Sequence, residues 1–186
     1  MKKNIITQQF TLVDYAPESL LKIVDQKLMI KEIKRQHKAK QRLTNDVFWV
    51  YYDYTKLDYI KYYQYIAEYC VDHYSRQYGE RLIMKDFLSA IVLPPGASIN
   101  FHNHIDDWDY VNNSYDVSFM YPLYVPKNSK SGVMFRYDNG RYKKQRWRVP
   151  IVDRQIIGWS SETEHCYQKN NSRETMILLV MRCAYE

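Results

Sequence analysis

Three histidines in the second half of the chain are the residues whose types and spacing best suit chemistry. His102 and His104 stand in the segment HNHIDDWD with Asp106 just after them, and His165 follows much later. Because side chains alternate between the two faces of a strand, we expect His102, His104 and Asp106 on one face. Imidazole nitrogens and a carboxylate oxygen bind divalent metal ions, and such a set leaves coordination positions open for a reactant. An alternative interpretation is that these polar residues only form the turn after a strand.

The elements that must position these side chains are short strands, which begin near Glu80 and continue to the end of the chain. They are expected in RLIMKDFLSAIVL, ASINFHNH, YDVSFMYPLYV, GVMFRY, YKKQRWRV, QIIGWS and TMILLVMRC. Turn-forming residues separate them, including Asp138-Asn139-Gly140, a typical hairpin turn. Many short strands at this spacing predict an all-β sandwich or barrel and not a parallel α/β sheet.

The first part of the chain is richer in helix. Apolar residues at helical spacing predict a helix that begins near Pro17 and continues past Ile33, and a second helix in LDYIKYYQYIAEYCVDHYSRQYG that ends at Gly79. Between them, VFWVYYDY is short, aromatic and β-branched, so a strand is expected there. We therefore predict a mainly β fold with N-terminal helices, in which residues 1–80 support a β core of residues 81–186 in one compact unit.

Composition excludes several classes of protein. The 186 residues are 46% apolar and 26% charged, with only 5 Gly and 6 Pro, which argues against a disordered or collagen-like chain. The three cysteines contain no C-x-x-C pair, and no apolar run is long enough for a membrane span. The expected location is the cytoplasm, with no membrane partner. That would be the host cytoplasm if the Lys-, Asn-, Ile- and Tyr-rich chain is phage-encoded.

Residues 83–182 resemble the double-stranded β-helix of the Fe(II)- and 2-oxoglutarate-dependent dioxygenases. LPPGASINFHNHIDD resembles the glycine turn and strand that lead into their H-x-D motif, and FMYPLYVPKNSKSGVMFRYDNG resembles the strands that follow. VPIVDRQIIGWSSETEHCYQKNNSRETMILLV is similar to their C-terminal signature, in which an arginine follows the distal histidine. The subgroups that look most alike are aspartyl/asparaginyl- and prolyl-hydroxylase-like proteins, including small phage-encoded ones. The resemblance implies a cupin-like jelly roll.

The resemblance also implies an activity and a set of ligands. Fe(II) would be bound by His104, Asp106 and His165, and 2-oxoglutarate would be the cosubstrate. The enzyme would hydroxylate a side chain or a small molecule and release succinate and CO2. No catalytic residue beyond the metal ligands is implied.

The cosubstrate would be bound by residues near the last strand. Arg173 matches the arginine whose planar guanidinium binds the distal carboxylate of 2-oxoglutarate, and Thr175 would point the same way. Tyr124 could reach the cosubstrate from the facing strand, as could Tyr121. A surface position for Arg173 and core positions for the two tyrosines are the alternatives.

A second register of the metal site stays open. Counted from Gly96, His102 falls where the family's first histidine is expected, and His104 then takes the place of the carboxylate. The resulting site of His102, His104 and His165 is that of a cupin, whose first motif is nearly matched with Asp109 for its glutamate. The second cupin motif is not matched around His165, so we favour H-x-D. A jelly roll that acts only as a binding or structural module is the third alternative.

The net charge of +6 permits acidic partners, and one basic segment could bind them. RYKKQRWRV places the cations of residues 141–148 around Trp147, next to the expected hairpin turn. Basic side chains interleaved with an aromatic ring suit an acidic peptide or protein and, less favoured, a nucleic-acid strand. The alternative is an edge strand whose charges prevent pairing with another sheet.

Overall fold

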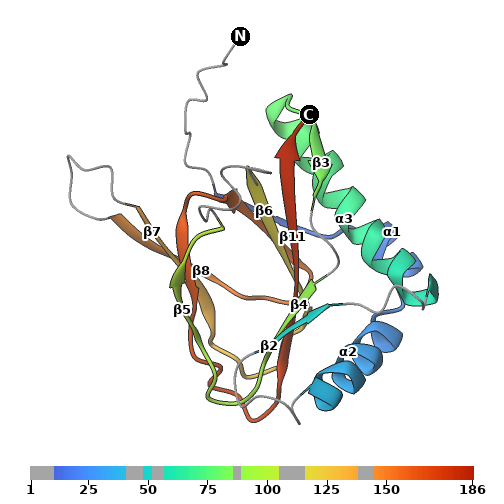
Figure 1. Ribbon diagram of the computed structural model, residues 1–186, viewed down its shortest axis with the longest axis vertical. Helices are drawn as coiled ribbons and strands as arrows, with labels where there is room; N and C mark the ends of the chain where they lie inside the picture. The colour runs from blue at the N-terminus through green and yellow to red at the C-terminus, as the bar shows by residue number, and fades with distance from the viewer. Residues whose placement is uncertain (1–10, 41–47, 52–56, 86–88, 105–115, 138–144) are drawn as a thin grey trace.

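Two antiparallel β-sheets lie face to face in the computed structural model, and helices pack on the outer side of the larger sheet (Figure 1). The structure describes residues 11–40, 48–51, 57–85, 89–104, 116–137 and 145–186. This arrangement is a jelly roll supported by N-terminal helices. It confirms the mainly β fold class predicted from the sequence.

The strands divide into a larger and a smaller sheet. Across the larger sheet the order is β1 (Thr11–Tyr15), β9 (Gln155–Ser160), β6 (Val117–Tyr124), β11 (Met176–Tyr185), β4 (Ser89–Leu93) and β2 (Phe48–Tyr51), and β3 (Leu82–Met84) also pairs with β11. The smaller sheet has the order β5 (Ile99–His102), β10 (Glu164–Tyr167), β7 (Gly132–Tyr137) and β8 (Gln145–Pro150). Neighbours in each sheet are antiparallel, as in a jelly roll.

The central strand β11 separates two apolar cores. Met176, Leu178 and Val180 belong to the core between the two sheets, whereas Ile177 and Leu179 belong to the core under the helices. Because both faces of the larger sheet are covered, this strand is apolar along almost its whole length and does not alternate with polar residues. His102, His104 and His165 lie on the side of the core between the two sheets.

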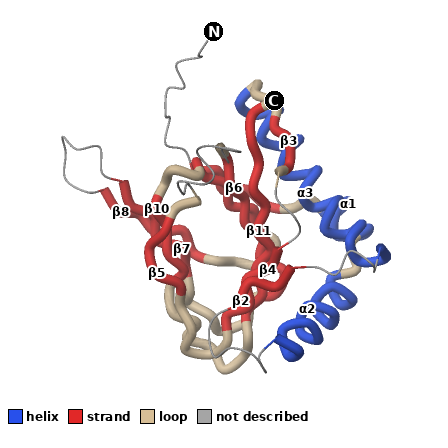
Figure 2. The backbone as a smooth tube through the Cα atoms, in the orientation of Figure 1, coloured by secondary structure: helices blue, strands red, loops and turns tan. Residues whose placement is uncertain are grey.

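Three helices of the described part of the chain cover the larger sheet: α1 (Glu18–Ile23), α2 (Gln26–Lys40) and α3 (Leu57–Tyr78) (Figure 2). On α3, Tyr63 and Tyr74 are buried in the core, as packing residues. This helix ends where the sequence predicts, since Gly79 follows it with a left-handed φ of 72°.

The first helical segment differs from the single helix that we expected. It is broken between α1 and α2 at Val24, whose backbone is extended. The carboxylate of Asp25 then accepts a hydrogen bond of 2.9 Å from the N–H of Leu28, which caps the start of α2. The apolar spacing continues through this break, so periodicity alone could not locate it.

Other sequence expectations have mixed outcomes. The strand expected in VFWVYYDY is present as β2, whereas β1 was not predicted. RLIMKDFLSAIVL contains two strands, β3 and β4, where one segment was expected. Asp138-Asn139-Gly140 lies outside the described residues, although β7 and β8 pair on either side of it. The division into residues 1–80 and 81–186 stays a prediction.

Two turns at one end of the sheets are hydrogen-bonded to each other. One precedes β5 and the other follows β10. In the turn at 94–96, the N–H of Ala97 donates to the carbonyl of Pro94 (3.0 Å), and Gly96 has a φ of 81° that favours glycine. Asn170, in the turn between β10 and β11, exchanges 2.8 Å backbone hydrogen bonds with Gly96 and Ala97. Its buried side-chain amide donates to the carbonyl of Leu93 at 2.8 Å.

Candidate metal centre

Two neighbouring strands of the smaller sheet bring His102 and His165 face to face. The antiparallel register of β5 and β10 places the two residues directly opposite each other. Their ring centroids are 4.2 Å apart. Because both side chains point to the same face of the sheet, they meet in the space between the two sheets.

His104 completes a cluster of three histidines. It follows β5, and its backbone N–H donates to the carbonyl of Ser161 (3.0 Å), which turns this segment toward the larger sheet. Its ring centroid lies 5.5 Å from that of His102 and 4.8 Å from that of His165. One ligand nitrogen from each histidine lies within 4.8 Å of the others. Asp106, the predicted carboxylate ligand, lies outside the described residues.

The Nδ1 atom of each ring is occupied by a hydrogen bond. The partner of His102 is the carbonyl of Asn100 at 2.9 Å, and the partner of His165 is the carbonyl of Thr163 at 3.2 Å. Because a carbonyl only accepts, these two rings carry their proton on Nδ1 and present an unprotonated Nε2.

His104 is held by a side chain of the larger sheet. Its Nδ1 lies 2.5 Å from the Oγ of Ser118 on β6, and that hydroxyl is hydrogen-bonded in turn to the Oγ of Ser161 (3.0 Å). Both serines are buried. Hydrogen bonds of this kind orient histidine ligands in metal sites and fix their tautomer.

The three Nε2 atoms are buried and have no hydrogen-bond partner among the residues that the structure describes. A buried polar atom without a partner is unfavourable, and three such atoms facing one another are rare unless something binds among them. Three neutral imidazoles fit Zn²⁺ or Fe²⁺. The donor set of this cluster therefore fits a divalent metal ion.

Burial keeps the imidazoles of His104 and His165 neutral. It lowers the pKa of His104 well below its ordinary value, and the neighbouring His165 and His102 lower it further. Burial, with a smaller contribution from His102, also lowers the pKa of His165 to about 3. Since the neutral ring is the form that binds a metal ion, the site is ready for its ion near neutral pH.

Aromatic side chains surround the cluster. The ring of Trp159, on β9, is 4.8 Å from that of His165, and the ring of Tyr167, on β10, is 5.7 Å from it. Phe135, on β7, also lies beside His165, at 6.2 Å. These rings exclude water and lower the local dielectric constant, which strengthens the binding of an ion by neutral ligands.

The residues predicted to bind the cosubstrate lie elsewhere on the fold. Arg173 is exposed in the turn before β11, and Thr175 is half-buried there. The hydroxyl of Tyr124 donates to the carboxylate of Glu174, and its ring packs against the core under the helices. Tyr121 accepts a hydrogen bond of 3.0 Å from the side chain of Gln26 on α2. These contacts are on the helix side of the larger sheet, and a role in cosubstrate binding stays a prediction.

Sequence reasoning found the histidines and missed the residues that support them. Ser118, Trp159 and Tyr167 carry no local motif and come next to the cluster only through strand pairing. The one available signal for Tyr167 was its spacing from His165, which places both on the same face of a strand.

The basic segment forms the end of the smaller sheet, because β8 is the last strand in its order. The guanidinium of Arg146 lies 6.0 Å from the ring centre of Phe101, and Arg148 is hydrogen-bonded to Gln168 (2.6 Å). Residues 141, 143 and 144 lie outside the described residues. Because β8 is an end strand, its charges could prevent pairing with another sheet. Arg146 and Arg148 are exposed, so they could also bind an acidic partner.

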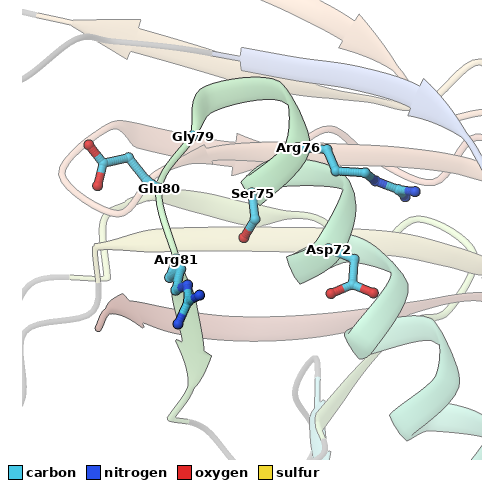
Figure 3. Close-up of a pocket in the computed structure, with 6 residues that line it drawn as sticks. All are labelled: Asp72, Ser75, Arg76, Gly79, Glu80 and Arg81. Atoms are coloured by element: carbon cyan, nitrogen blue, oxygen red, sulfur yellow. The ribbon is translucent and has the colours of Figure 1, made fainter.

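A hollow of about 330 Å³ lies at the end of α3 (Figure 3). Its lining residues are Asp72, Ser75, Arg76, Gly79, Glu80 and Arg81. Acidic and basic side chains alternate around it, and it contains none of the three histidines. It therefore does not belong to the candidate metal centre.

Solved structures with the same fold include several prolyl hydroxylases. The viral collagen prolyl hydroxylase of Paramecium Bursaria Chlorella virus-1, solved with 2OG, has a TM-score of 0.61 at 10% identity, over 96% of this chain and 97% of the other. A prolyl hydroxylase of Trichoplax adhaerens, solved with a peptide fragment of hypoxia inducible factor, has a TM-score of 0.63 at 9% identity, over 96% and 84%. The prolyl-4-hydroxylase of Pseudomonas putida has a TM-score of 0.58 at 13% identity, over 94% and 84%.

These similarities confirm that the chain has the jelly-roll fold of these prolyl hydroxylases. The sequence itself matches no protein-family model, and no curated protein is similar to it. None of the helices in the described ranges has both the length and the apolar character required to span a membrane. Fold and histidine cluster together define a jelly-roll protein with a candidate non-haem metal centre.

Proposed function

We propose that this protein is an Fe(II)- and 2-oxoglutarate-dependent dioxygenase that hydroxylates a side chain or a small molecule and releases succinate and CO2. The observation that carries the proposal is the convergence of three buried, unpartnered Nε2 atoms. The jelly-roll fold shared with prolyl hydroxylases supports it.

The chain's own residues would position the reactants. His104 and His165 hold the metal ion, and Ser118 and the carbonyl of Thr163 fix the orientation of the two rings. Fe(II), when bound with 2-oxoglutarate, supplies the oxidising chemistry. The apolar walls formed by Trp159 and Phe135 exclude water from the reacting centre.

The third ligand is proposed to be Asp106, in the H-x-D register, with His102 as the alternative. The closeness of His102 to His165 supports the second register. The two are separated by metal analysis of the variants Asp106→Ala and His102→Ala. Loss of iron from the first variant alone would support H-x-D, and loss from the second alone would support H-x-H.

The cosubstrate residues remain those of the family resemblance: Arg173, Thr175 and Tyr124. Arg173 is exposed in the turn before β11, so its assignment rests on the family resemblance alone. If Arg173→Gln binds 2-oxoglutarate as tightly as the parent does in calorimetry, this assignment is wrong.

The activity is tested by the conversion of 2-oxoglutarate to succinate. The iron-loaded protein should form succinate in the presence of dioxygen, measured by proton NMR, because such enzymes turn over slowly without their substrate. His104→Ala and His165→Ala should form none, and Ser89→Ala, a buried serine on β4, is the control variant. Iron-loaded protein that forms no succinate with any added substrate would contradict the proposal.

A cupin-type metal enzyme is the second candidate, because the three histidines that meet are those of the H-x-H register. Such an enzyme would bind iron without requiring 2-oxoglutarate. A jelly roll that acts only as a binding or structural module is the third candidate. Purified protein that takes up no divalent metal would favour that module.

An acidic peptide or protein is proposed as the substrate or partner, with a nucleic-acid strand as the less favoured alternative. The exposed Arg146 and Arg148 of β8 support an acidic partner, and one structural neighbour was solved with a peptide. We expect the protein to act in the cytoplasm.

A further inference from the structure

Two more buried polar atoms beside the histidine cluster have no hydrogen-bond partner in the described part of the chain. They are the indole Nε1 of Trp159 and the hydroxyl of Tyr167. Both side chains are fully buried. The metal ion alone would not satisfy either atom, because an indole N–H is only a donor and a neutral phenol is a weak metal ligand.

These two side chains reach the centre from different sheets. Trp159, on β9 of the larger sheet, lies 4.8 Å from His165 and 6.0 Å from His104, measured between ring centroids. Tyr167, on β10 of the smaller sheet, lies 5.7 Å from His165 and 6.4 Å from His102. Each therefore touches two of the three candidate ligands, and His165 lies next to both.

The surrounding protein offers these atoms little to bind. The buried residues packed around them in the core between the sheets are apolar, among them Met120, Leu178 and Val133. A phenol keeps its proton at neutral pH, so the hydroxyl of Tyr167 can donate. An acceptor supplied by a bound molecule would satisfy both donors and remove an unfavourable feature of the core.

We propose that Trp159 and Tyr167 are the hydrogen-bond donors for the oxygen atoms of a small organic acid that binds beside the metal ion. A carboxylate is the fitting group, because it only accepts hydrogen bonds and its charge would be balanced by the divalent ion. This inference rests on the proposed function, in which 2-oxoglutarate is that acid. It assigns specificity-determining contacts to residues that no sequence motif marks.

The indole N–H of Trp159 gives a direct readout that does not depend on activity. Protein labelled with ¹⁵N-tryptophan and loaded with Zn²⁺, which is diamagnetic and redox-inert, is titrated with 2-oxoglutarate. The indole signal of Trp159, assigned with Trp159→Phe, should shift in step with binding measured by calorimetry. The signal of Trp147, assigned with Trp147→Phe, is the control and should not move. Binding of the acid without a shift at Trp159 would overturn the proposal.

Water is the competing explanation, since an ordered water molecule can also satisfy buried donors. In that case the signal of Trp159 would be the same with and without the organic acid, even at saturation. That result would count against the proposal.

Removal of the tyrosine hydroxyl tests the second donor. Tyr167→Phe keeps the ring and should weaken the binding of 2-oxoglutarate by about 10- to 100-fold, the usual effect of losing a hydrogen bond to a charged group. Its affinity for Zn²⁺ should not change. The matched control is Tyr63→Phe, which removes a buried hydroxyl bonded to the carbonyl of Val180 (2.5 Å). Equal affinity of Tyr167→Phe and the parent would show that this hydroxyl is not a contact.

The inference and the proposed function can fail separately. If the zinc-loaded parent binds no 2-oxoglutarate, the proposed function is contradicted, and the titration is repeated with acetate, oxalate and succinate. A shift of the Trp159 signal with one of these acids would still support the two donors. No response to any acid would overturn both.

Discussion

At the scale of single residues, the candidate metal centre depends on the hydrogen bonds that orient each imidazole. Ser118 illustrates this, since its hydroxyl bonds the Nδ1 of His104 and aims the opposite nitrogen at the other histidines. The sequence predicted His104 and His165 because histidine spacing on a strand is a local property. It could not predict Ser118 or Trp159, whose roles arise only when strands distant in sequence pair, and for Tyr167 it offered only the spacing from His165.

Ser118→Ala should lower the affinity for a divalent metal ion by about 10- to 100-fold, because such partners orient the ligand. The measurement is a competition titration of zinc against a chromophoric chelator. Ser89→Ala also removes a buried serine hydroxyl, which in this case bonds the carbonyl of Val180, and should bind zinc like the parent. Equal zinc affinities for both variants would contradict the role of Ser118.

The metal-free protein should lose stability as the pH falls below about 6.5. The pKa of His165 is near 6.5 in the unfolded chain and about 3 in the folded protein, so between these values the unfolded state binds the additional proton. Within this range, the protonation of His165 should therefore lower the free energy of unfolding by about 1.4 kcal/mol for each unit by which the pH falls.

Urea unfolding of the chelator-treated protein at pH 7 and pH 5.5 measures this effect. His165→Gln should reduce the dependence, because its side chain does not titrate, and the contribution of His104 should remain. A parent protein that is equally stable at both pH values would show that His165 is already protonated, or solvated, in the folded state.

At the scale of elements, the turn around Asn170 links the two strands that carry His102 and His165. It follows β10 and is hydrogen-bonded to the turn that precedes β5. The sequence predicted the strands on both sides, because their apolar runs and turn residues are local. It could not reveal that Asn170 bonds the turn before β5, and the asparagine looked like an ordinary loop residue. The sequence also did not reveal the break between α1 and α2. The apolar residues keep a helical spacing through the break, so this local pattern predicted one continuous helix.

Asn170→Ala should destabilise the fold by about 1–3 kcal/mol, because it leaves the buried carbonyl of Leu93 without its donor. It should also weaken zinc binding, since the side-chain amide no longer ties this turn, which is bonded to the turn before β5, to the end of β4. Thermal unfolding and the zinc titration measure the two effects. The neighbouring Asn171→Ala, at an exposed position, is the control. A stable Asn170→Ala variant with parental zinc affinity would contradict this role.

At the scale of the whole molecule, the helices cover one face of the larger sheet and leave the other for the metal centre (Figure 2). This layering followed from the sequence, because helix-rich and strand-rich segments are separated along the chain. The order of the strands did not follow, since it depends on pairing between distant segments. The net positive charge could be predicted from the sequence. The basic segment of residues 141–148 leads to a further prediction.

Neutralising Lys143, Lys144 and Arg146 together with glutamine should weaken the binding of a fluorescein-labelled poly-glutamate peptide and flatten its salt dependence. Succinate formation without substrate should not change. The control replaces Lys31, Lys34 and Lys38, exposed cations of α2, with glutamine. Unchanged peptide affinity at low and high salt would leave these charges a role only in protecting the edge strand.

The central proposal is that His104 and His165, with Asp106 or alternatively His102 as the third ligand, bind Fe(II) together with 2-oxoglutarate. Anaerobic titration of the iron-loaded protein with 2-oxoglutarate, followed by visible absorption, tests it most directly. We predict a weak charge-transfer band that saturates at one equivalent and is absent in His104→Ala and His165→Ala. Iron binding without a band would contradict the claim and favour a cupin-type enzyme.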